Sequence, residues 1–108
     1  MMFGRKASVM TISSKDALEK QQAGGVIIDV REDYEWAPKH IKAAVHIPLG
    51  AVANRLPQLC PDKNTPLIFY CAAGARAGRA ADAAVKLGYA EVYNLGGIGN
   101  WAFEFERG

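Results

Sequence analysis

The stretch "PLIFYCAAGARAGRAADAAVKLGY", residues 66–89, joins a short apolar run to an alanine-rich segment through a loop that begins with a cysteine. The run 66–70 does not alternate between apolar and polar residues, which is typical of a strand covered on both faces. The segment 75–88 favours a helix that closes at Gly88. The stretch therefore predicts a strand, a loop and a helix of an α/β fold, with Cys71 where the strand ends.

Further apolar runs of this kind lie before and after residues 66–89, and each is followed by a polar stretch or a helical signal. They occupy residues 8–12, 26–30, 43–48 and 91–95. The alternation predicts a three-layer α/β fold whose central, mostly parallel sheet has about five strands and is flanked by helices. We expect residues 1–108 to form a single domain of this class, with residues 1–7 disordered.

Local signals mark where the predicted helices begin and end. Ser13 or Ser14 is a good N-cap for the first helix, which should stop at the glycine pair 24–25. The next helix should end before Pro38, because a proline pushes the preceding residue out of the α region. A further short helix is predicted within residues 49–59.

The totals limit the classes of function. The chain has 108 residues, half of them hydrophobic, and a net charge of +2 from 13 basic and 11 acidic residues. This charge is too small and too mixed for a nucleic-acid-binding surface. No apolar segment is long enough for a signal peptide or a membrane span, so we expect a cytoplasmic protein with no membrane partner. A segment upstream of this chain is left open.

The two cysteines cannot build a disulfide framework, and neither has the spacing of a metal site. We expect free thiols, no metal and no cofactor. Cys60 lies in the helix-end and turn context "PQLCPDKN", so we interpret it as structural. Its pairing with Cys71 under oxidation is left open.

Three residues are expected at one edge of the sheet, since ligands of open parallel sheets bind beyond the carboxyl ends of the strands. Asp29 and Arg31 follow one predicted strand, and Cys71 ends another. Asp29 and Arg31 are candidates for a supporting role at the cysteine. For Arg31, an ion pair with Asp29 or Glu35 is at least as well favoured, and Asp29 is more readily structural.

The loop after Cys71 has the features of an anion cradle. Its backbone N–H groups converge where a helix begins, and its small side chains let these amides approach a ligand closely. Gly74 permits the positive φ that a tight loop often needs. The same field favours the thiolate, so we expect Cys71 to be largely ionised near neutral pH. The predicted substrate-binding residues are Ala72, Ala73, Gly74, Ala75, Arg76 and Arg79.

The two arginines are unfavourably placed for helix stability, because cations in the first turn oppose the helix dipole. An anion at the cradle, either the thiolate or a substrate, would offset that cost. The alternatives are that Arg79 pairs with Asp82 and that Arg76 points to water. For Cys71 the alternative is a buried, inert residue at the end of a strand.

The order of motifs along the chain carries further information. "IIDVREDYEWAPKHIKAAVHIP", residues 27–48, precedes the strand that ends in "CAAGAR", and "NLGGIGNW", residues 94–101, follows it. Together these motifs resemble the rhodanese-homology domain family of sulfurtransferases, from about residue 11 to residue 101.

The chain departs from the family pattern at four places. Ala72 and Ala73 follow the cysteine where some members have basic or polar side chains, which puts firm binding of thiosulfate in question. The other three lie away from the cysteine loop. They are Lys39, Ala43-Ala44 and His46, where the family usually has Gly, Gly-Ala and Asn.

The resemblance also bears on a choice between two chemistries. Sulfurtransferases of the family have a six-residue loop counted from the cysteine. The related phosphatases have a seven-residue loop, with a His before the Cys and an Arg at the sixth position beyond it. Here Tyr70 precedes Cys71 and Arg76 lies five positions beyond it, so the resemblance favours sulfur transfer.

The implied activity is transfer of a sulfane sulfur from thiosulfate or a similar small anionic donor, through a persulfide on Cys71, to cyanide or a thiol. Two alternatives stay open. One is a persulfide carrier or interaction module that takes sulfur from a protein donor, and the more distant one is an arsenate reductase or phosphatase. Thioredoxin-like or other sulfur-relay proteins are the implied partners.

Three remaining features are interpreted without a catalytic role. His40 and His46 are expected to be packing or surface residues. The glycines of "LGGIGNW" are expected to turn the chain near the cysteine with Trp101 packed beneath, a partner-docking surface being the alternative. The aromatics of residues 101–108 fit either a C-terminal helix docked on the sheet or a surface that pairs with a second chain.

Overall fold

A five-stranded sheet forms the middle layer of the computed structural model, which describes residues 8–108. The predicted disorder of residues 1–7 lies outside this range. The strands of the sheet are β1 (Val9–Thr11), β2 (Val26–Asp29), β4 (Val45–His46), β5 (Leu67–Cys71) and β6 (Val92–Gly97). The helices are α1 (Ser14–Gln22), α2 (Asp33–Trp36), α3 (Val52–Leu59) and α4 (Ala75–Lys86), with 3₁₀ turns η1 (Leu49–Ala51) and η2 (Ile98–Asn100).

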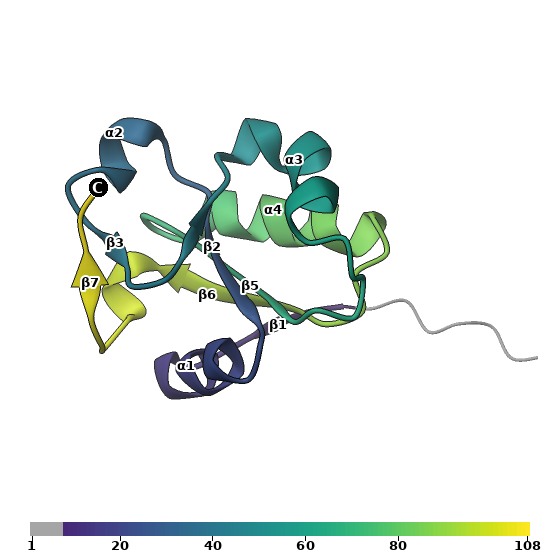
Figure 1. Ribbon diagram of the computed structural model, residues 1–108, viewed down its shortest axis with the longest axis horizontal. Coiled ribbons are helices and arrows are strands. Elements are labelled where there is room, and N and C mark those ends of the chain that lie inside the picture. The colour runs from purple at the N-terminus through teal and green to yellow at the C-terminus, as the bar shows by residue number, and fades with distance from the viewer. Residues whose placement is uncertain (1–7) are drawn as a thin grey trace, which may run out of the picture.

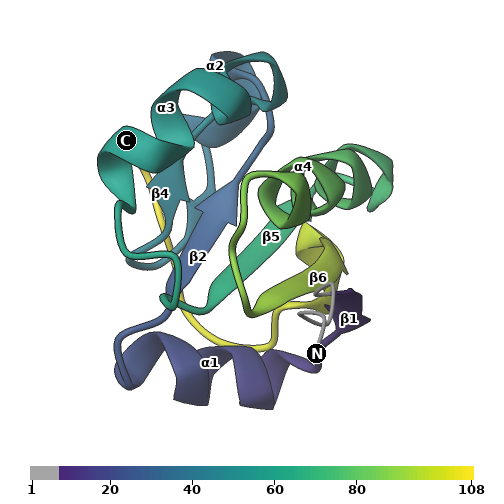
Figure 2. The same ribbon diagram turned by 90° about the vertical axis from the view of Figure 1, so that its right-hand side faces the viewer.

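The strands lie in the order β1-β6-β5-β2-β4, and every neighbouring pair is parallel. Helix α1 covers one face, and α3 and α4 cover the other (Figures 1 and 2). The predicted three-layer α/β architecture is therefore confirmed. Strand β5 sits at the centre of the sheet, so its carboxyl end opens between two neighbouring strands, as expected for a binding site in such sheets.

The helix boundaries follow the local signals. The side chain of Ser13 caps α1 by accepting the N–H of Asp16 at 3.1 Å. A β carbon on Gly25 would lie 2.8 Å from the carbonyl oxygen of Lys20, so the chain can leave α1 there only with a glycine. Helix α2 ends at Trp36, before Pro38, as predicted.

The core is divided by the sheet into two clusters. Every residue of β5 is buried, because helices cover both faces of this strand. On the α4 face, four buried alanines of the helix bring its backbone close to Phe69 and its neighbours. On the α1 face, Tyr70 and Trp101 fill the space beside α1. The sheet is thereby a rigid support for the loop that follows Cys71.

The C-terminal residues correct one expectation, because they form no helix. Strand β7 (Phe105–Glu106) pairs antiparallel with β3 (His40–Ile41) in a separate two-stranded sheet. Buried Trp101 anchors the preceding turn by donating its indole N–H to the carbonyl oxygen of Glu104 at 2.9 Å. The segment is too short for a stable helix of its own, and pairing with β3 satisfies its backbone instead.

The turn after β3 contains Ala43, at one of the places where the sequence departs from the family that it resembles. Ala43 adopts φ 65°, the left-handed conformation that favours glycine, and the resembled family often has Gly-Ala at this place. The N–H of Ala43 donates to a carboxylate oxygen of Glu106 at 2.9 Å, which ties this turn to β7.

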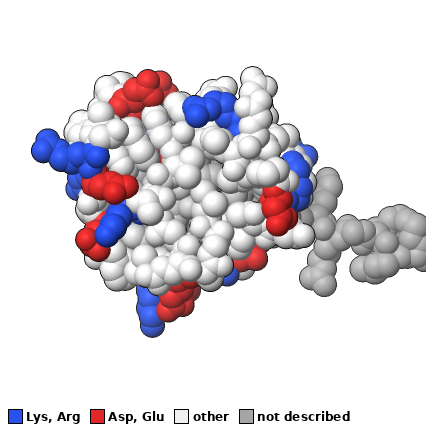
Figure 3. Space-filling model, viewed as in Figure 1, with Lys and Arg blue, Asp and Glu red and all other residues white. Residues whose placement is uncertain are grey.

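Charged side chains of both signs lie around the rim of one face of the molecule, and neither sign gathers into one patch there (Figure 3). No helix within residues 8–108 is long and apolar enough to cross a membrane.

Candidate active site

Cys71 ends β5, and its sulfur lies against the start of α4. The sulfur accepts the backbone N–H of Gly74 at 2.9 Å and that of Ala77 at 3.4 Å. Gly74 has φ 110°, the positive value expected for a tight loop, and it precedes the first helical residue of α4. Amides from the loop and from the first turn therefore point at one sulfur atom, the arrangement that stabilises an anion.

The side chains of residues 72–75 place no polar group on the outer surface of the loop. Ala72, Ala73 and Ala75 are exposed, and Gly74 is half-buried. The substrate-binding role predicted for these residues rests on their backbone, because none carries a polar side chain. The N–H of Ala77 is a donor that sequence reasoning missed, although the residue lies six positions after Cys71, at the start of the predicted helix.

The double glycine of β6 lies directly beside this loop. Gly96 and Gly97 are register partners of Tyr70 and Cys71. A β carbon on Gly97 would lie 2.6 Å from the carbonyl oxygen of Ala72, a distance that no side chain tolerates. The double glycine thus belongs to the end of β6 and not to the predicted turn, which follows as η2, and Trp101 is buried in the core cluster on the α1 face. The close approach of two backbones requires the glycine and shapes the loop.

The partner of Arg76 excludes two of the alternatives that the sequence left open. Its guanidinium donates to both carboxylate oxygens of Glu35, at 2.7 Å and 3.0 Å, so it does not point freely to water. Glu35 in turn does not pair with Arg31, because Arg31 is held by Asp29. The hydrogen bonds from Arg76 lower the pKa of Glu35 from 4.5 to about 2. The pKa of Arg76 is raised, first by Glu35 and to a lesser degree by the charge on Cys71.

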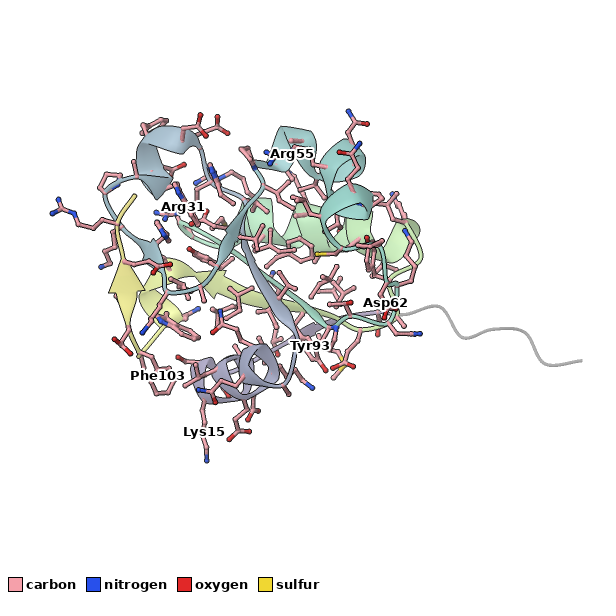
Figure 4. The ribbon with its side chains drawn as sticks, viewed as in Figure 1. Lys15, Arg31, Arg55, Asp62, Tyr93 and Phe103 are labelled. Carbon is pink, nitrogen blue, oxygen red and sulfur yellow. The ribbon has the colours of Figure 1, made fainter. Side chains whose placement is uncertain are left out.

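Arg31, which lies below α2 in Figure 4, forms a buried ion pair with Asp29. The Arg31 side chain donates to both Asp29 oxygens at 2.8 to 3.1 Å and also to the carbonyl oxygen of Lys39 at 2.7 Å. The ion pair that sequence reasoning weighed for Arg31 is thus confirmed. The pair adjoins Tyr70, whose pKa is raised by burial and then by a hydrogen bond to Asp29. The pair therefore packs against β5 at Tyr70, the residue before Cys71.

The two histidines enclose a tryptophan. The ring of Trp36 stacks on His40 with centroids 3.4 Å apart and on His46 with centroids 4.7 Å apart. His40 Nδ1 hydrogen-bonds to the carbonyl oxygen of Trp36 at 2.9 Å, and His46 Nε2 to that of Arg31 at 2.7 Å. Both histidines are packing residues, as expected, and they hold α2 in place.

Comparison with known proteins agrees with this geometry. Residues 13–104 match the family model described as the Rhodanese-like domain. The chain belongs to the rhodanese family. It is 36% identical over 81 residues to "Thiosulfate sulfurtransferase PspE" of Escherichia coli (strain K12), covering 75% of this chain and 78% of that protein. A solved structure described as "rhodanese with anions from E. coli" superposes with a TM-score of 0.75 at 34% identity, over 78% of this chain and 99% of that one.

The relatives do not all share one activity. The chain is also 32% identical over 93 residues to "tRNA uridine(34) hydroxylase" of Chlamydia pneumoniae, which covers 80% of this chain but 29% of that protein. The chain therefore belongs to the rhodanese family and is similar to sulfurtransferases of that family. Family membership alone does not fix its reaction, which depends on the residues of its own site.

Two sequence-based ideas about this rhodanese domain are not supported. Within residues 8–108, no ion pair joins Arg79 to Asp82, and Arg79 is exposed. The oxidative pairing of Cys60 with Cys71 is disfavoured, because the two residues lie toward opposite ends of β5, which spans about 13 Å. Figure 4 shows Asp62, close to Cys60 in sequence, at the far end of the sheet from Arg31. Burial raises the pKa of Cys60.

A cleft of about 510 Å³ lies on the α1 side of the rhodanese domain, between α1 and residues 101–104. It shares no residue with the cysteine loop, and Phe103 lies at its edge. In the described part of the chain, no group of three His, Cys, Asp or Glu residues could hold a metal ion.

Proposed function

We propose that this rhodanese domain transfers a sulfane sulfur through a persulfide on Cys71. The observation that carries the proposal is the pair of amide N–H groups directed at the Cys71 sulfur, 2.9 Å and 3.4 Å away. Such donors stabilise a thiolate before the reaction and a persulfide anion after it. The other cysteine, Cys60, lies at the end of α3, and within residues 8–108 no N–H group donates to its sulfur.

In the first half-reaction, the Cys71 thiolate attacks the outer sulfur of a donor such as thiosulfate. A sulfur–sulfur bond forms to Cys71, and the bond inside thiosulfate breaks. Sulfite leaves with the electron pair of that bond, so no external oxidant or reductant is needed. The loop amides hold the terminal sulfur of the resulting persulfide, whose negative charge replaces that of the thiolate.

In the second half-reaction, a nucleophile removes the terminal sulfur. Cyanide attacks this sulfur, leaves as thiocyanate and returns Cys71 to the thiolate. A thiol, including one on a thioredoxin-like protein, can play the same part and becomes a persulfide itself. The enzyme therefore alternates between two covalent states, and ping-pong kinetics are expected.

The loop supports sulfur transfer in preference to phosphoryl transfer. Phosphoryl transfer needs cationic groups aimed at the oxygens of the transferred group. Here the arginine of the loop is bonded to Glu35, and the residues next to Cys71 are exposed alanines. What remains at the sulfur is a cradle of amides, which suits a single anionic atom.

A protein donor is the second candidate as the source of the sulfur. Ala72 and Ala73 are exposed and offer no charge to hold a small dianion, and Arg76 is committed to Glu35. A donor protein that brings its own persulfide to this mouth has no need of such charges, because binding is provided by the rest of its surface.

The test is to incubate the protein with thiosulfate, record the intact mass, and then add cyanide and measure thiocyanate. The wild type and Cys60→Ala gain one sulfur atom and lose it to cyanide, whereas Cys71→Ala gains none. Sulfur gain by Cys71→Ala, or none by the wild type from any donor, contradicts the proposal. Gain only from a persulfidated protein selects the second candidate.

A further inference from the structure

Arg76 carries the positive charge of the cysteine loop, yet the structure neutralises it locally. Its guanidinium and the Glu35 carboxylate meet in a two-point contact, 2.7 Å and 3.0 Å long, between residues 41 positions apart in the sequence. The two side chains are 30% and 18% exposed, so solvent screens the pair less than it screens a surface ion pair. The contact therefore holds both side chains in a fixed position at the entrance to the cysteine loop.

Glu35 is held in position from three sides. Its Oε1 also accepts the N–H of Glu32 at 2.9 Å, as part of a capping box at the start of α2. The next residue, Trp36, is stacked between His40 and His46. The carboxylate is thus a preorganised partner, and Arg76 can leave it only by giving up both hydrogen bonds.

The charge of Arg76 matters at the reacting sulfur. Arg76 directly precedes Ala77, whose backbone N–H donates to the Cys71 sulfur at 3.4 Å, so Arg76 stands in the helical turn that faces this sulfur. In agreement, Cys71 contributes to the raised pKa of Arg76, after the larger contribution of Glu35. An anionic donor at Cys71 therefore experiences Arg76 and Glu35 together, as a pair with no net charge. The exposed acid Asp33 on the same helix adds a negative charge that solvent screens.

We infer that Glu35 is a specificity-determining residue that withholds the charge of Arg76 from the donor. With Glu35 in place, a doubly charged donor such as thiosulfate gains no net attraction from the loop side chains. Donors with a single negative charge, or a persulfide on a protein, are penalised less. For sulfur donors this inference rests on the proposed function, but its electrostatic content concerns Cys71 alone.

A pair of alkylating reagents measures the local charge without any sulfur transfer. Iodoacetate is an anion and iodoacetamide is neutral. In both cases the Cys71 sulfur forms a bond to carbon and iodide leaves. The ratio of their rates at Cys71, measured in a Cys60→Ala background, reports the electrostatic potential at the sulfur.

In Glu35→Gln, we expect the iodoacetate to iodoacetamide ratio to rise about three- to tenfold, as for one uncovered charge a few ångströms away in partly solvated surroundings. Arg76→Gln uncovers Glu35 instead, and the ratio falls below the wild-type value. The double variant restores a neutral mouth and returns the ratio towards wild type. Glu35→Asp, which keeps the charge, stays near wild type.

Several outcomes overturn the inference. An unchanged or lower ratio in Glu35→Gln means that Arg76 does not act on the sulfur once released. Equal acceleration of both reagents indicates a loosened loop, without a change of potential. An increase that persists at high ionic strength also contradicts it, because salt screens a charge effect. Circular dichroism of each variant checks that the fold is retained.

The donor arm compares thiosulfate, with two negative charges, with methanethiosulfonate, with one. In Glu35→Gln, KM for thiosulfate falls several times more than KM for methanethiosulfonate, with little change in kcat. A purely structural role for Glu35 lowers kcat for both donors equally. If the alkylation ratio changes as expected but no variant takes sulfur from either donor, the proposed function fails and the electrostatic role of Glu35 stands.

Discussion

The two cysteines of the chain, Cys71 at the end of β5 and Cys60 at the end of α3, have environments that differ in a way that burial does not explain. Cys71 is 1% exposed and Cys60 is 6% exposed, and both belong to the same core cluster. The Cys71 sulfur accepts two backbone N–H groups. Within residues 8–108, no hydrogen bond reaches the Cys60 sulfur, and burial raises the pKa of Cys60. Local amides, rather than exposure, therefore distinguish the two thiols.

The means of support also differ between the two ends of the sheet. At the Cys71 end, the buried Asp29–Arg31 pair lies against Tyr70 of β5, and the partly exposed Glu35–Arg76 pair joins α2 to α4. Near Cys60, the hydroxyl of Tyr89 donates to the carbonyl oxygen of Cys60, and neutral groups do the packing. Within residues 8–108, the buried ion pair Asp29–Arg31 lies at the carboxyl end of the sheet, where a parallel fold places its ligands.

The largest expected effect is a difference in thiol reactivity. Iodoacetamide at neutral pH is expected to modify Cys71 about a thousandfold faster than Cys60, because two amides favour the thiolate of Cys71 whereas Cys60 is buried without such donors. Peptide mass mapping over time measures both rates in one sample. In denaturant, the two rates should become similar. Equal rates in the folded protein would show that the amides at Cys71 confer no advantage.

Next in size is the effect of breaking the buried ion pair. Asp29→Asn leaves Arg31 without its carboxylate and should lower the free energy of unfolding by about 3 kcal/mol. Tyr89→Phe, the matched change at the Cys60 end, removes one neutral hydrogen bond and should cost about 1 kcal/mol. Urea denaturation measures both. A smaller loss in Asp29→Asn than in Tyr89→Phe would contradict the contrast between the two ends.

A smaller effect is expected from crowding the cysteine loop. In Gly97→Ala, the new methyl group collides with the carbonyl oxygen of Ala72, 2.6 Å from its ideal position, and shifts the amides that face Cys71. The rate of sulfur gain from the donor should fall about ten- to a hundredfold. Gly99→Ala is the control, because nothing lies within 4 Å of its β carbon. Similar rates of sulfur gain in the two variants would show that the shape of the loop does not control the reactivity of Cys71.

The smallest effect concerns pH. The pKa of Glu35 is lowered from 4.5 to about 2 in the folded protein, so its ion pair stabilises the fold fully above pH 4.5 and loses that contribution as the pH falls to 2. At neutral pH, Glu35→Gln should be less stable than wild type by about 1 to 2 kcal/mol, since the pair is partly solvated.

This difference should disappear near pH 2, as measured by urea denaturation across the acid range. Lys63→Met is the control at the Cys60 end, where the ammonium group donates to the carbonyl oxygen of Leu87. Its stability difference from wild type should not change in the same way over that range. A Glu35→Gln difference that is constant from pH 7 to pH 2 would contradict the assigned pKa.

Much of the fold could be predicted because its signals are local. The short apolar runs became β1, β2, β4, β5 and β6, and the Ser13 cap and Pro38 bounded the first two helices where expected. The C-terminal strand β7 could not be predicted in this way. It exists because its backbone pairs with β3, more than sixty residues earlier, and two-residue strands leave almost no pattern in a sequence.

The sequence by itself determined that a cysteine ends a buried strand and enters a helix through a glycine loop. These features depend on neighbouring residues, whose periodicity and φ preferences are local properties. The tertiary structure alone decided that Arg76 bonds to Glu35, that Arg31 bonds to Asp29 and that Gly97 must lack a side chain. Pairing of charges and close approach of backbones depend on distances in space, and a chain with several acids and bases permits many pairings until packing selects one.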